Sequence, residues 1–343
     1  GRADRTMAMT SPTMTVPIGM ITQMLDRLGH PPGAASEAVA RAGIAPALLA
    51  RPSARVTVEQ FAVFYRALVV QMDDETPGLF SRPLRGGTLK FLCLGLVGAP
   101  SLRVALHRFC CFFRLVLDDL AFRMTACEGV EGIVIEERRD LGAQRVLILE
   151  LMLLLIQGIA SWMAERRLRF VRVDLAYPPP PHADEYLNMY AGPAVFGRPA
   201  TMLVFEAGTL DLPVRQDKAA VSAFLRRAPT DWIRPPAGER LLTHRVRDLF
   251  EARLSRPPSI PEVARALHLS PRTLARRLDA EGTHFQAIKG AVRRDAAIVR
   301  LLCTDLPIAT IGAQLGFEDP AAFNRAFRQW AGMPPGGYRK GRP

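Results

Sequence analysis

Two copies of one helical pattern in the C-terminal third constrain the fold of this chain more than any other feature. The later copy begins with an apolar stripe at helical spacing, made of Ile308, Ile311 and Leu315. Gly316 accepts the positive φ of a helix C-terminus, and Phe317 supplies an apolar side chain for the turn. The next helix is capped by Asp319, opens at Pro320 and has an aromatic stripe: Phe323, Phe327 and Trp330. Two short helices joined by a tight glycine turn predict a helix-turn-helix.

The earlier copy repeats this order upstream. Ser259 and Glu262 have the spacing of a capping box, which marks the start of a helix. That helix is predicted to bury Val263, Ala264 and Leu267, with Leu269 in the turn. Ser270 caps the following helix and Pro271 opens it. One such pattern alone is as typical of an ordinary helical hairpin as of a DNA-binding helix-turn-helix. The presence of a second copy favours nucleic-acid binding.

A continuous amphipathic helix is predicted between the two copies, from Phe285 to Cys303. At 1.5 Å per residue it spans on the order of 30 Å. The grooves of B-DNA repeat after roughly 34–36 Å, so a rigid helix of this length can place two recognition helices in successive major grooves. The spacing therefore predicts that one chain reads two adjacent sites on DNA.

The stretch from Glu239 to Lys340 resembles the DNA-binding domain of AraC/XylS-family transcription regulators. The resemblance rests on the twin helix-turn-helix, the long connecting helix and the closing run Ile308…Leu315-Gly316-Phe317…Phe323…Phe327…Gly332…Pro335…Tyr338-Arg339. It implies a sequence-specific DNA-binding regulator of transcription, and an activator in particular. The family usually has a polar residue at the start of the second recognition helix, where this chain has Pro320, Ala321 and Ala322. That departure predicts sparse base reading by the second helix.

The stretch from Arg169 to Val214 is similar to the N-terminal effector domain of one AraC subgroup, the arabinose-binding-like one. The similarity lies in Val173-Asp174-Leu175-Ala176-Tyr177-Pro178-Pro179-Pro180 and in Tyr186…Tyr190…Phe196-Gly197-Arg198-Pro199…Phe205…Leu210…Leu212-Pro213-Val214. It implies a domain that senses a small molecule or forms a dimer. The sequence predicts four strands in this part of the chain, over 120–126, 132–137, 170–176 and 201–206. It also predicts helices, including a long apolar one over 141–166.

The predicted organisation is an α+β effector domain followed by an all-α DNA-binding domain with two helix-turn-helix motifs joined by a long helix. We expect a flexible tail over 1–16, an effector-binding and dimerisation domain over 17–224, a linker over 225–238 and the DNA-binding domain over 239–343. The net charge is +12, and residues 236–343 alone hold 18 Lys or Arg against 10 Asp or Glu. The basic excess is concentrated where phosphates would be neutralised.

The exposed faces of the two recognition helices supply the predicted DNA contacts. An arginine early in such a helix can bond guanine O6 and N7 with two hydrogen bonds, so the first helix is the main reader. The predicted base contacts are Arg272, Thr273, Arg276, Asn324 and Arg325. The predicted phosphate contacts, which position the protein without reading sequence, are Ser270, Arg277, Arg328, Arg339 and Lys340.

The subgroup resemblance implies a small organic effector, such as an amino acid, a fatty acid or another carboxylate. Three cationic side chains could pair with that carboxylate: Arg55, Arg198 and Lys218. The other expected partners are double-stranded DNA, RNA polymerase and a second copy of the chain in a homodimer. We expect no cofactor beyond the effector.

Two other functional classes compete with this interpretation. An enzyme fused to a DNA-binding module would need a nucleophile elbow, paired carboxylates or a metal cluster, and the sequence has no such motif. An effector-free architectural DNA-binding protein would keep the same C-terminal chemistry.

The five cysteines form no C-x-x-C pair, which favours reduced thiols in the cytoplasm. No membrane span is expected, because the apolar run over 146–160 is too short. No metal site is expected either.

Overall fold

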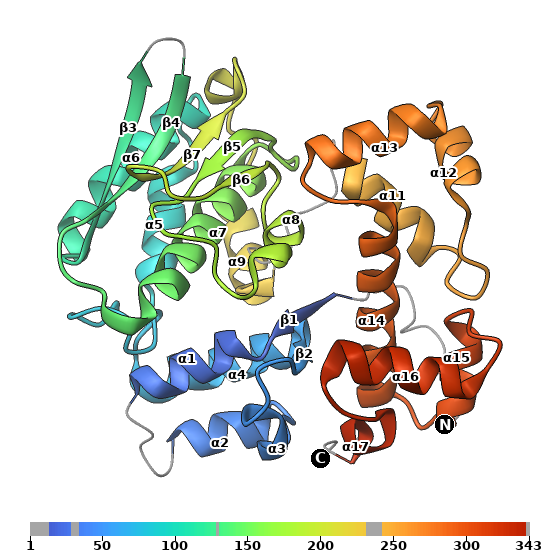
Figure 1. Cartoon of the computed structure of the whole chain (residues 1–343). Helices are drawn as coiled ribbons and strands as arrows, with labels where there is room; N and C mark the ends of the chain where they lie inside the picture. Colours follow the sequence, from blue (N-terminus) through green and yellow to red (C-terminus); the bar gives the residue numbers. More distant parts are fainter. Residues whose placement is uncertain (1–13, 29–33, 128–129, 231–241, 341–343) are drawn as a thin grey trace. The chain divides into compact units, whose positions relative to one another are not determined.

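The structure is a computed structural model that describes residues 14–28, 34–127, 130–230 and 242–340. Its contacts divide the chain into two compact units, and each is described by itself (Figure 1). Unit 1 contains the N-terminal residues up to Ile18, Gly43–Val58 and Arg245–Pro343. Unit 2 contains Gly19–Ala42 and Glu59–His244. The predicted effector domain over 17–224 therefore differs from the structure, in which residues 43–58 pack with the C-terminal helices.

Unit 1 is built around α14, the helix Phe285–Cys303. Its bounds match the prediction, and its buried stripe contains Ile288, Val292 and Leu301. Helices α15, α16 and α17 pack against it. The other helices that lie wholly or mainly in this unit are α3 (Pro46–Leu49), α11 (Leu242–Glu251), α12 (Ile260–Ala266), α13 (Pro271–Ala280), α15 (Ile308–Gln314), α16 (Pro320–Ala331) and α17 (Pro335–Arg339).

A two-stranded antiparallel sheet also belongs to unit 1. Strand β1 (Thr15–Pro17) pairs with β2 (Arg55–Thr57), with Val16 opposite Val56, and both strands contact α14. The predicted tail over 1–16 is thus wrong for Thr15 and Val16, whose side chains are buried. A strand of three residues is too short to show an alternating pattern that could be recognised in the sequence. These two strands are ordered by their burial against α14.

Unit 2 combines a five-stranded sheet with helices. The strand order is β3-β4-β7-β5-β6, and every pair is antiparallel except β5 with β6. The four predicted strands are confirmed, and the two-residue β6 was not predicted. The strand bounds are β3 Leu120–Cys127, β4 Val130–Glu137, β5 Phe170–Asp174, β6 Ala194–Val195 and β7 Thr201–Phe205.

The helices of unit 2 surround the long α7. This helix runs from Arg145 to Met163, and all its residues from Leu147 on are buried. The segment Gly142–Met163 is long and apolar enough to cross a bilayer, but 94% of its most apolar window is buried inside the protein, so it serves as a core helix. The remaining helices are α1 (Gly19–Arg27), α2 (Ala34–Arg41), α4 (Val58–Met72), α5 (Thr88–Leu96), α6 (Leu102–Val116), α8 (Tyr186–Met189) and α9 (Lys218–Arg227).

The predicted fold class is confirmed, with a sheet-containing N-terminal region and a helical C-terminal region. Part of the predicted linker is helical, because α9 continues to Arg227. Residues 231–238 of that linker and the predicted turn at 128–129 lie outside the described residues.

Candidate nucleic-acid interface

The first helix-turn-helix consists of α12 and α13. The predicted capping box is present: Ser259 donates both its backbone N–H and its hydroxyl to Glu262, at 2.7 and 2.6 Å. These hydrogen bonds lower the pKa of the Glu262 carboxyl. The turn passes through His268 with a φ of 56°. A side chain other than glycine is strained in this left-handed conformation.

Helix α13 buries one face and exposes a basic one. Leu274 and Leu278 are fully buried, while Arg272, Arg276 and Arg277 are exposed. Arg272 and Arg276 lie one turn apart, so their side chains are neighbours on the same face. No ion pair within the described part of the chain holds any of these three guanidinium groups. They are therefore available to an external anion.

The N-terminus of α13 is capped by Ser270. Its Oγ accepts from the backbone N–H of Thr273 at 3.1 Å and also lies 2.8 Å from the Thr273 hydroxyl. Ser270 is exposed and Thr273 is half-buried. The hydroxyl of Thr273, a predicted base contact, is thus engaged in the cap, which leaves its methyl group for contact.

The second helix-turn-helix consists of α15 and α16, and its turn is closely packed. Gly316 has a φ of 73°, and a Cβ there would lie 2.9 Å from Pro257 Cδ and 3.0 Å from the Ser255 carbonyl oxygen. Only glycine fits this position without movement of its neighbours. Arg293 of α14 donates to the Gly316 carbonyl at 3.0 Å and lies over the Phe317 ring, 4.6 Å from its centroid. The predicted apolar role of Phe317 in the turn is confirmed.

The N-terminus of α16 differs in charge from that of α13. Asp319 caps it, accepting from the N–H groups of Ala321 and Ala322 at 2.9 and 3.1 Å. Arg325 Nη2 lies 3.9 Å from the same carboxylate, and the Asn324 amide donates to the Pro320 carbonyl at 2.9 Å. Both predicted base contacts of α16 are exposed, but each already has an intrahelical partner.

The predicted phosphate contacts fall into two groups. Ser270, Arg277, Arg328 and Lys340 are exposed. Arg339 is half-buried, and its guanidinium donates to the backbone carbonyl of Leu306. Arg339 is therefore engaged with the protein itself.

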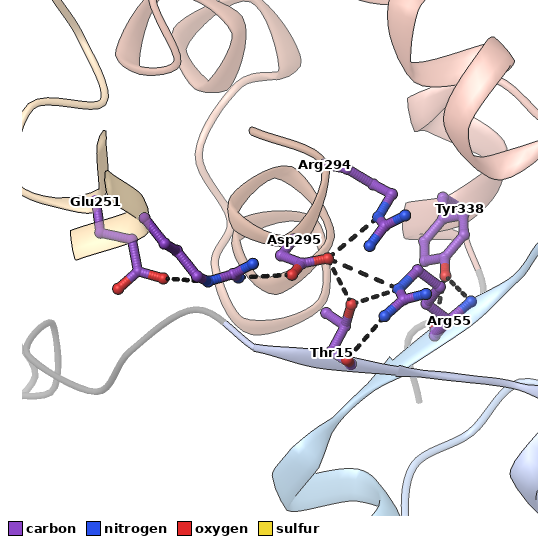
Figure 2. A network of polar contacts seen from close by, with 7 residues as sticks. Thr15, Arg55, Glu251, Arg294, Asp295 and Tyr338 are labelled. Atoms are coloured by element: carbon purple, nitrogen blue, oxygen red, sulfur yellow. Dashed lines mark hydrogen bonds and ion pairs between the residues drawn. The ribbon is translucent and has the colours of Figure 1, made fainter. Parts of the chain in front are cut away.

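Sequence reasoning missed a buried charge network on α14 (Figure 2). Asp295 is 3% exposed. Its carboxylate accepts hydrogen bonds from Arg247 Nη2 at 2.7 Å, from the Thr15 hydroxyl at 2.7 Å and from Arg294 Nε at 3.2 Å, and Arg55 Nε lies 3.7 Å away. Burial raises the pKa of Asp295, but the charges of Arg294, Arg247 and Arg55 outweigh burial and hold that pKa below its usual value.

The network joins the two-stranded sheet to the C-terminal helices. Arg55 donates from Nε to the Thr15 hydroxyl at 2.6 Å and from Nη2 to the Thr15 carbonyl at 2.8 Å. Its backbone N–H donates to the Tyr338 hydroxyl at 2.9 Å, and that hydroxyl in turn donates to the Arg55 carbonyl. The sequence carried one signal for the network, since Asp295 interrupts the apolar stripe of α14.

The three predicted effector contacts lie in different surroundings. Arg55 belongs to unit 1, where Thr15 and Asp295 occupy its guanidinium. Arg198 belongs to unit 2 and lies 3.6 Å from Asp174. Lys218 is exposed on the first turn of α9. Among the described residues, no group of three or more His, Cys, Asp or Glu side chains is placed to hold a metal ion.

Two family models match the chain. One, described as the arabinose-binding domain of AraC transcription regulators, N-terminal, matches residues 33–214. The other, a helix-turn-helix domain, matches residues 263–341. The first match alone covers more than half of the chain.

Individual proteins are similar over parts of this length. The ornithine utilization regulator of Pseudomonas aeruginosa is 35% identical over 227 residues, which are 66% of this chain and 64% of that protein, so the match spans less than two thirds of the relative. The transcriptional activator NphR of Rhodococcus sp is 39% identical over 82 residues, 24% of each chain. The solved structure of the transcriptional regulator CdpR from Pseudomonas aeruginosa aligns with 94% of this chain and 97% of its own at 20% identity, with a TM-score of 0.31.

Proposed function

Because the chain belongs to the AraC/XylS family of transcription regulators, we propose that it selects its DNA sites chiefly through α13, with α16 as a weaker second reader. The contrast in charge between the two helix N-termini carries this proposal. The face of α13 presents Arg272 and Arg276 without an ion pair, whereas α16 begins with a carboxylate. A carboxylate beside the DNA backbone opposes binding, and a free arginine in the major groove reads guanine.

The individual contacts follow from exposure. Arg272 and Arg276 bond base edges, and the methyl group of Thr273 contacts a thymine methyl. Asn324 and Arg325 contact bases in the second groove once they leave their intrahelical partners. Phosphates are contacted by Ser270, Arg277, Arg328 and Lys340, and Arg339 steadies the end of α17 and adds positive charge there. Helix α14, with its 19 residues, spans about 28 Å and sets the spacing between the two readers.

We further propose that a small organic effector bound in unit 2 controls the C-terminal helices. The order of the chain supports this. Strand β2 ends at Thr57 in unit 1, and α4 begins at Val58 and continues into unit 2 with no residue between them. A movement of the first turn of α4 therefore moves β2, and with it Arg55 and its contacts to Asp295. In this proposal the protein is a cytoplasmic homodimer that activates transcription by contact with RNA polymerase, and it is not an enzyme.

Selection of bound sequences from a random DNA pool at a fixed salt concentration tests the proposal. We expect an enriched site with two boxes about one helical turn apart, of which one is strongly and the other weakly specified. Binding that is equally tight for all sequences and depends only on salt would contradict it. That outcome would identify an architectural DNA-binding protein instead.

A further inference from the structure

Unit 2 contains a cavity of 40 Å³ beside α4, α5 and α7. Its lining is almost entirely apolar and includes Phe61 of α4, Leu92 of α5, Leu151 and Leu155 of α7, and Phe113 of α6. A water molecule needs roughly 10–15 Å³ on this scale, so the cavity has room for about three or four separate water-sized groups, or for a chain of about five heavy atoms, because bonded atoms overlap. Met152 also lines it, and its flexible side chain can adapt to a guest.

Within the described part of the chain, one carboxylate, that of Glu75, lines this apolar cavity. Glu75 is half-buried, and its two oxygens accept from the backbone N–H groups of Gly87 at 2.8 Å and Leu89 at 2.6 Å. A carboxylate has about four acceptor positions, so two remain for a guest. The Tyr65 hydroxyl, which also lines the cavity, donates to the backbone carbonyl of Glu75 at 2.6 Å. The polar groups thus offer a hydrogen-bond acceptor with its position fixed by α4 and α5.

The charges around Glu75 favour a cationic guest. Burial raises the pKa of Glu75, and the neighbouring Asp74 and Asp73 raise it further. Asp73 pairs with Arg85 at 3.2 Å, but Asp74 accepts only from neutral donors such as the Thr76 hydroxyl. Among the residues that the structure describes, no Lys, Arg or His lines the cavity. A bound carboxylate would therefore be unpaired and repelled, whereas a primary ammonium would be attracted.

The cavity borders two of the four segments in which the chain passes between unit 2 and unit 1. Phe61 and Tyr65 lie on α4, which directly follows β2. Pro229 also lines the cavity and precedes the connection to α11. Arg66 of α4 donates to the Ala228 carbonyl at 3.2 Å, which holds these two segments together. A guest that shifts α4 or Pro229 thus acts on the covalent connections to the DNA-binding helices.

We propose that this cavity is the effector site, and that the effector is a small apolar molecule with a primary amine that binds Glu75. This assignment rests on the proposed control of the protein by an organic effector. It replaces the expected carboxylate effector, because Arg55, Arg198 and Lys218 are all absent from the lining. The ammonium donates to the free acceptor positions of Glu75, and an apolar body of about four carbons fills the space between Phe61, Leu92 and Leu155.

Three matched probes test the assignment on the full chain: n-butylamine, butan-1-ol and butanoate. Calorimetry and thermal shift at constant pH and ionic strength should show that butylamine binds about tenfold tighter than butanol, since hydrogen bonds to charged groups are the stronger ones. Butanoate should produce no shift in melting temperature. Butanoate binding as tight as that of butylamine would overturn the assignment.

Two variants locate the binding. Glu75→Gln should lower butylamine affinity about tenfold and leave butanol affinity unchanged. Glu150→Gln is the matched control, because it removes another buried carboxylate of unit 2 that lies outside the cavity lining, and it should keep the preference for the amine. If Glu75→Gln does not fold, Leu155→Phe should fill the cavity and abolish binding of both butylamine and butanol. An unchanged amine preference in Glu75→Gln, or unchanged binding in Leu155→Phe, would overturn the assignment.

The same preparation separates this assignment from the proposed function. Selection of DNA sites without any amine present measures DNA reading alone. If a two-box site is enriched but butylamine does not bind, the cavity assignment fails and DNA reading stands. If butylamine binds through Glu75 but no DNA sequence is enriched, sequence reading fails and the cavity assignment stands.

Discussion

The two helix-turn-helix motifs of unit 1 share one pattern but differ in how they are built. The first has a strained His268 in its turn, a neutral cap at Ser270 and a recognition helix with free arginines. The second has Gly316 in its turn, an anionic cap at Asp319 and an aromatic core in which Phe323, Phe327 and Tyr338 are fully buried. The difference teaches that two copies of one motif can keep the same backbone pattern and still differ in charge and packing, and the proposed function assigns most of the DNA reading to the first copy.

Loss of Asp295 should have the largest effect, because it removes the charge that connects α14, the two-stranded sheet and α11. Asp295→Ala leaves the buried Arg55 and Arg247 and the half-buried Arg294 without their shared carboxylate, and we expect unit 1 to lose about 3–5 kcal/mol of stability. Urea unfolding measures the loss, and hydrogen exchange should show loosening of α17 and the sheet before α13. A loss below about 1 kcal/mol would show that the second motif does not depend on this network.

The same carboxylate predicts a smaller, pH-dependent effect. The folded-state pKa of Asp295 lies below its unfolded value, so its stabilising contribution is present at neutral pH and is lost as pH falls through the folded-state pKa. The free energy of unfolding should therefore fall more steeply on acidification in the wild type than in Asp295→Asn. Urea unfolding between neutral and acidic pH checks this. Equal slopes in the two proteins would contradict a depressed pKa.

Substitutions in the turns of the two motifs should change the stability of unit 1 in opposite directions. Gly316→Ala forces a side chain into a left-handed φ and against backbone, so it should destabilise unit 1 by about 1–3 kcal/mol. His268→Gly relieves the strain at the matching position of the first motif and should stabilise it by about 0.5–1 kcal/mol. Thermal unfolding of both variants is the measurement. A stabilised Gly316→Ala, or a destabilised His268→Gly, would mean that strain does not distinguish the turns.

The reading helices are compared through binding to selected and mismatched DNA. Arg276→Ala should cost about 1–3 kcal/mol at one base position and relax preference there. Arg328→Ala, which removes a proposed phosphate contact, should weaken binding to all sequences evenly and reduce the salt slope by about one. Arg325→Ala should have a smaller effect on preference than Arg276→Ala, because Asp319 already holds Arg325. Equal loss of preference from Arg276→Ala and Arg325→Ala would remove the distinction between the helices.

The smallest expected effect concerns the anionic cap. Asp319→Ser keeps an acceptor for the N–H groups of Ala321 and Ala322 and removes one negative charge from the N-terminus of α16, the end that the proposal places toward DNA. DNA affinity at low salt should rise by roughly two- to fivefold, and the gain should disappear at high salt. Unchanged affinity at every salt concentration would place Asp319 away from DNA.

The sequence by itself determined the elements whose signals are local. The capping box at Ser259, the cap at Ser270, the glycine turn at Gly316 and the full extent of α14 all depend on residues a few positions apart, and each was predicted at its observed place. The exposed basic face of α13 followed from the same helical period. The assignment of individual arginines to bases or phosphates stays a prediction, because it depends on DNA.

The tertiary structure alone decided the features that join distant residues. Thr15 and Asp295 are 280 positions apart, and no local pattern indicates that their side chains share a hydrogen bond. The strands β1 and β2 are ordered by burial against α14, not by their own three-residue sequences, so neither strand was predicted. The cavity lining likewise comes from segments as distant as Phe61 and Pro229. Periodicity reports which face of an element is buried, whereas only packing decides what that face meets.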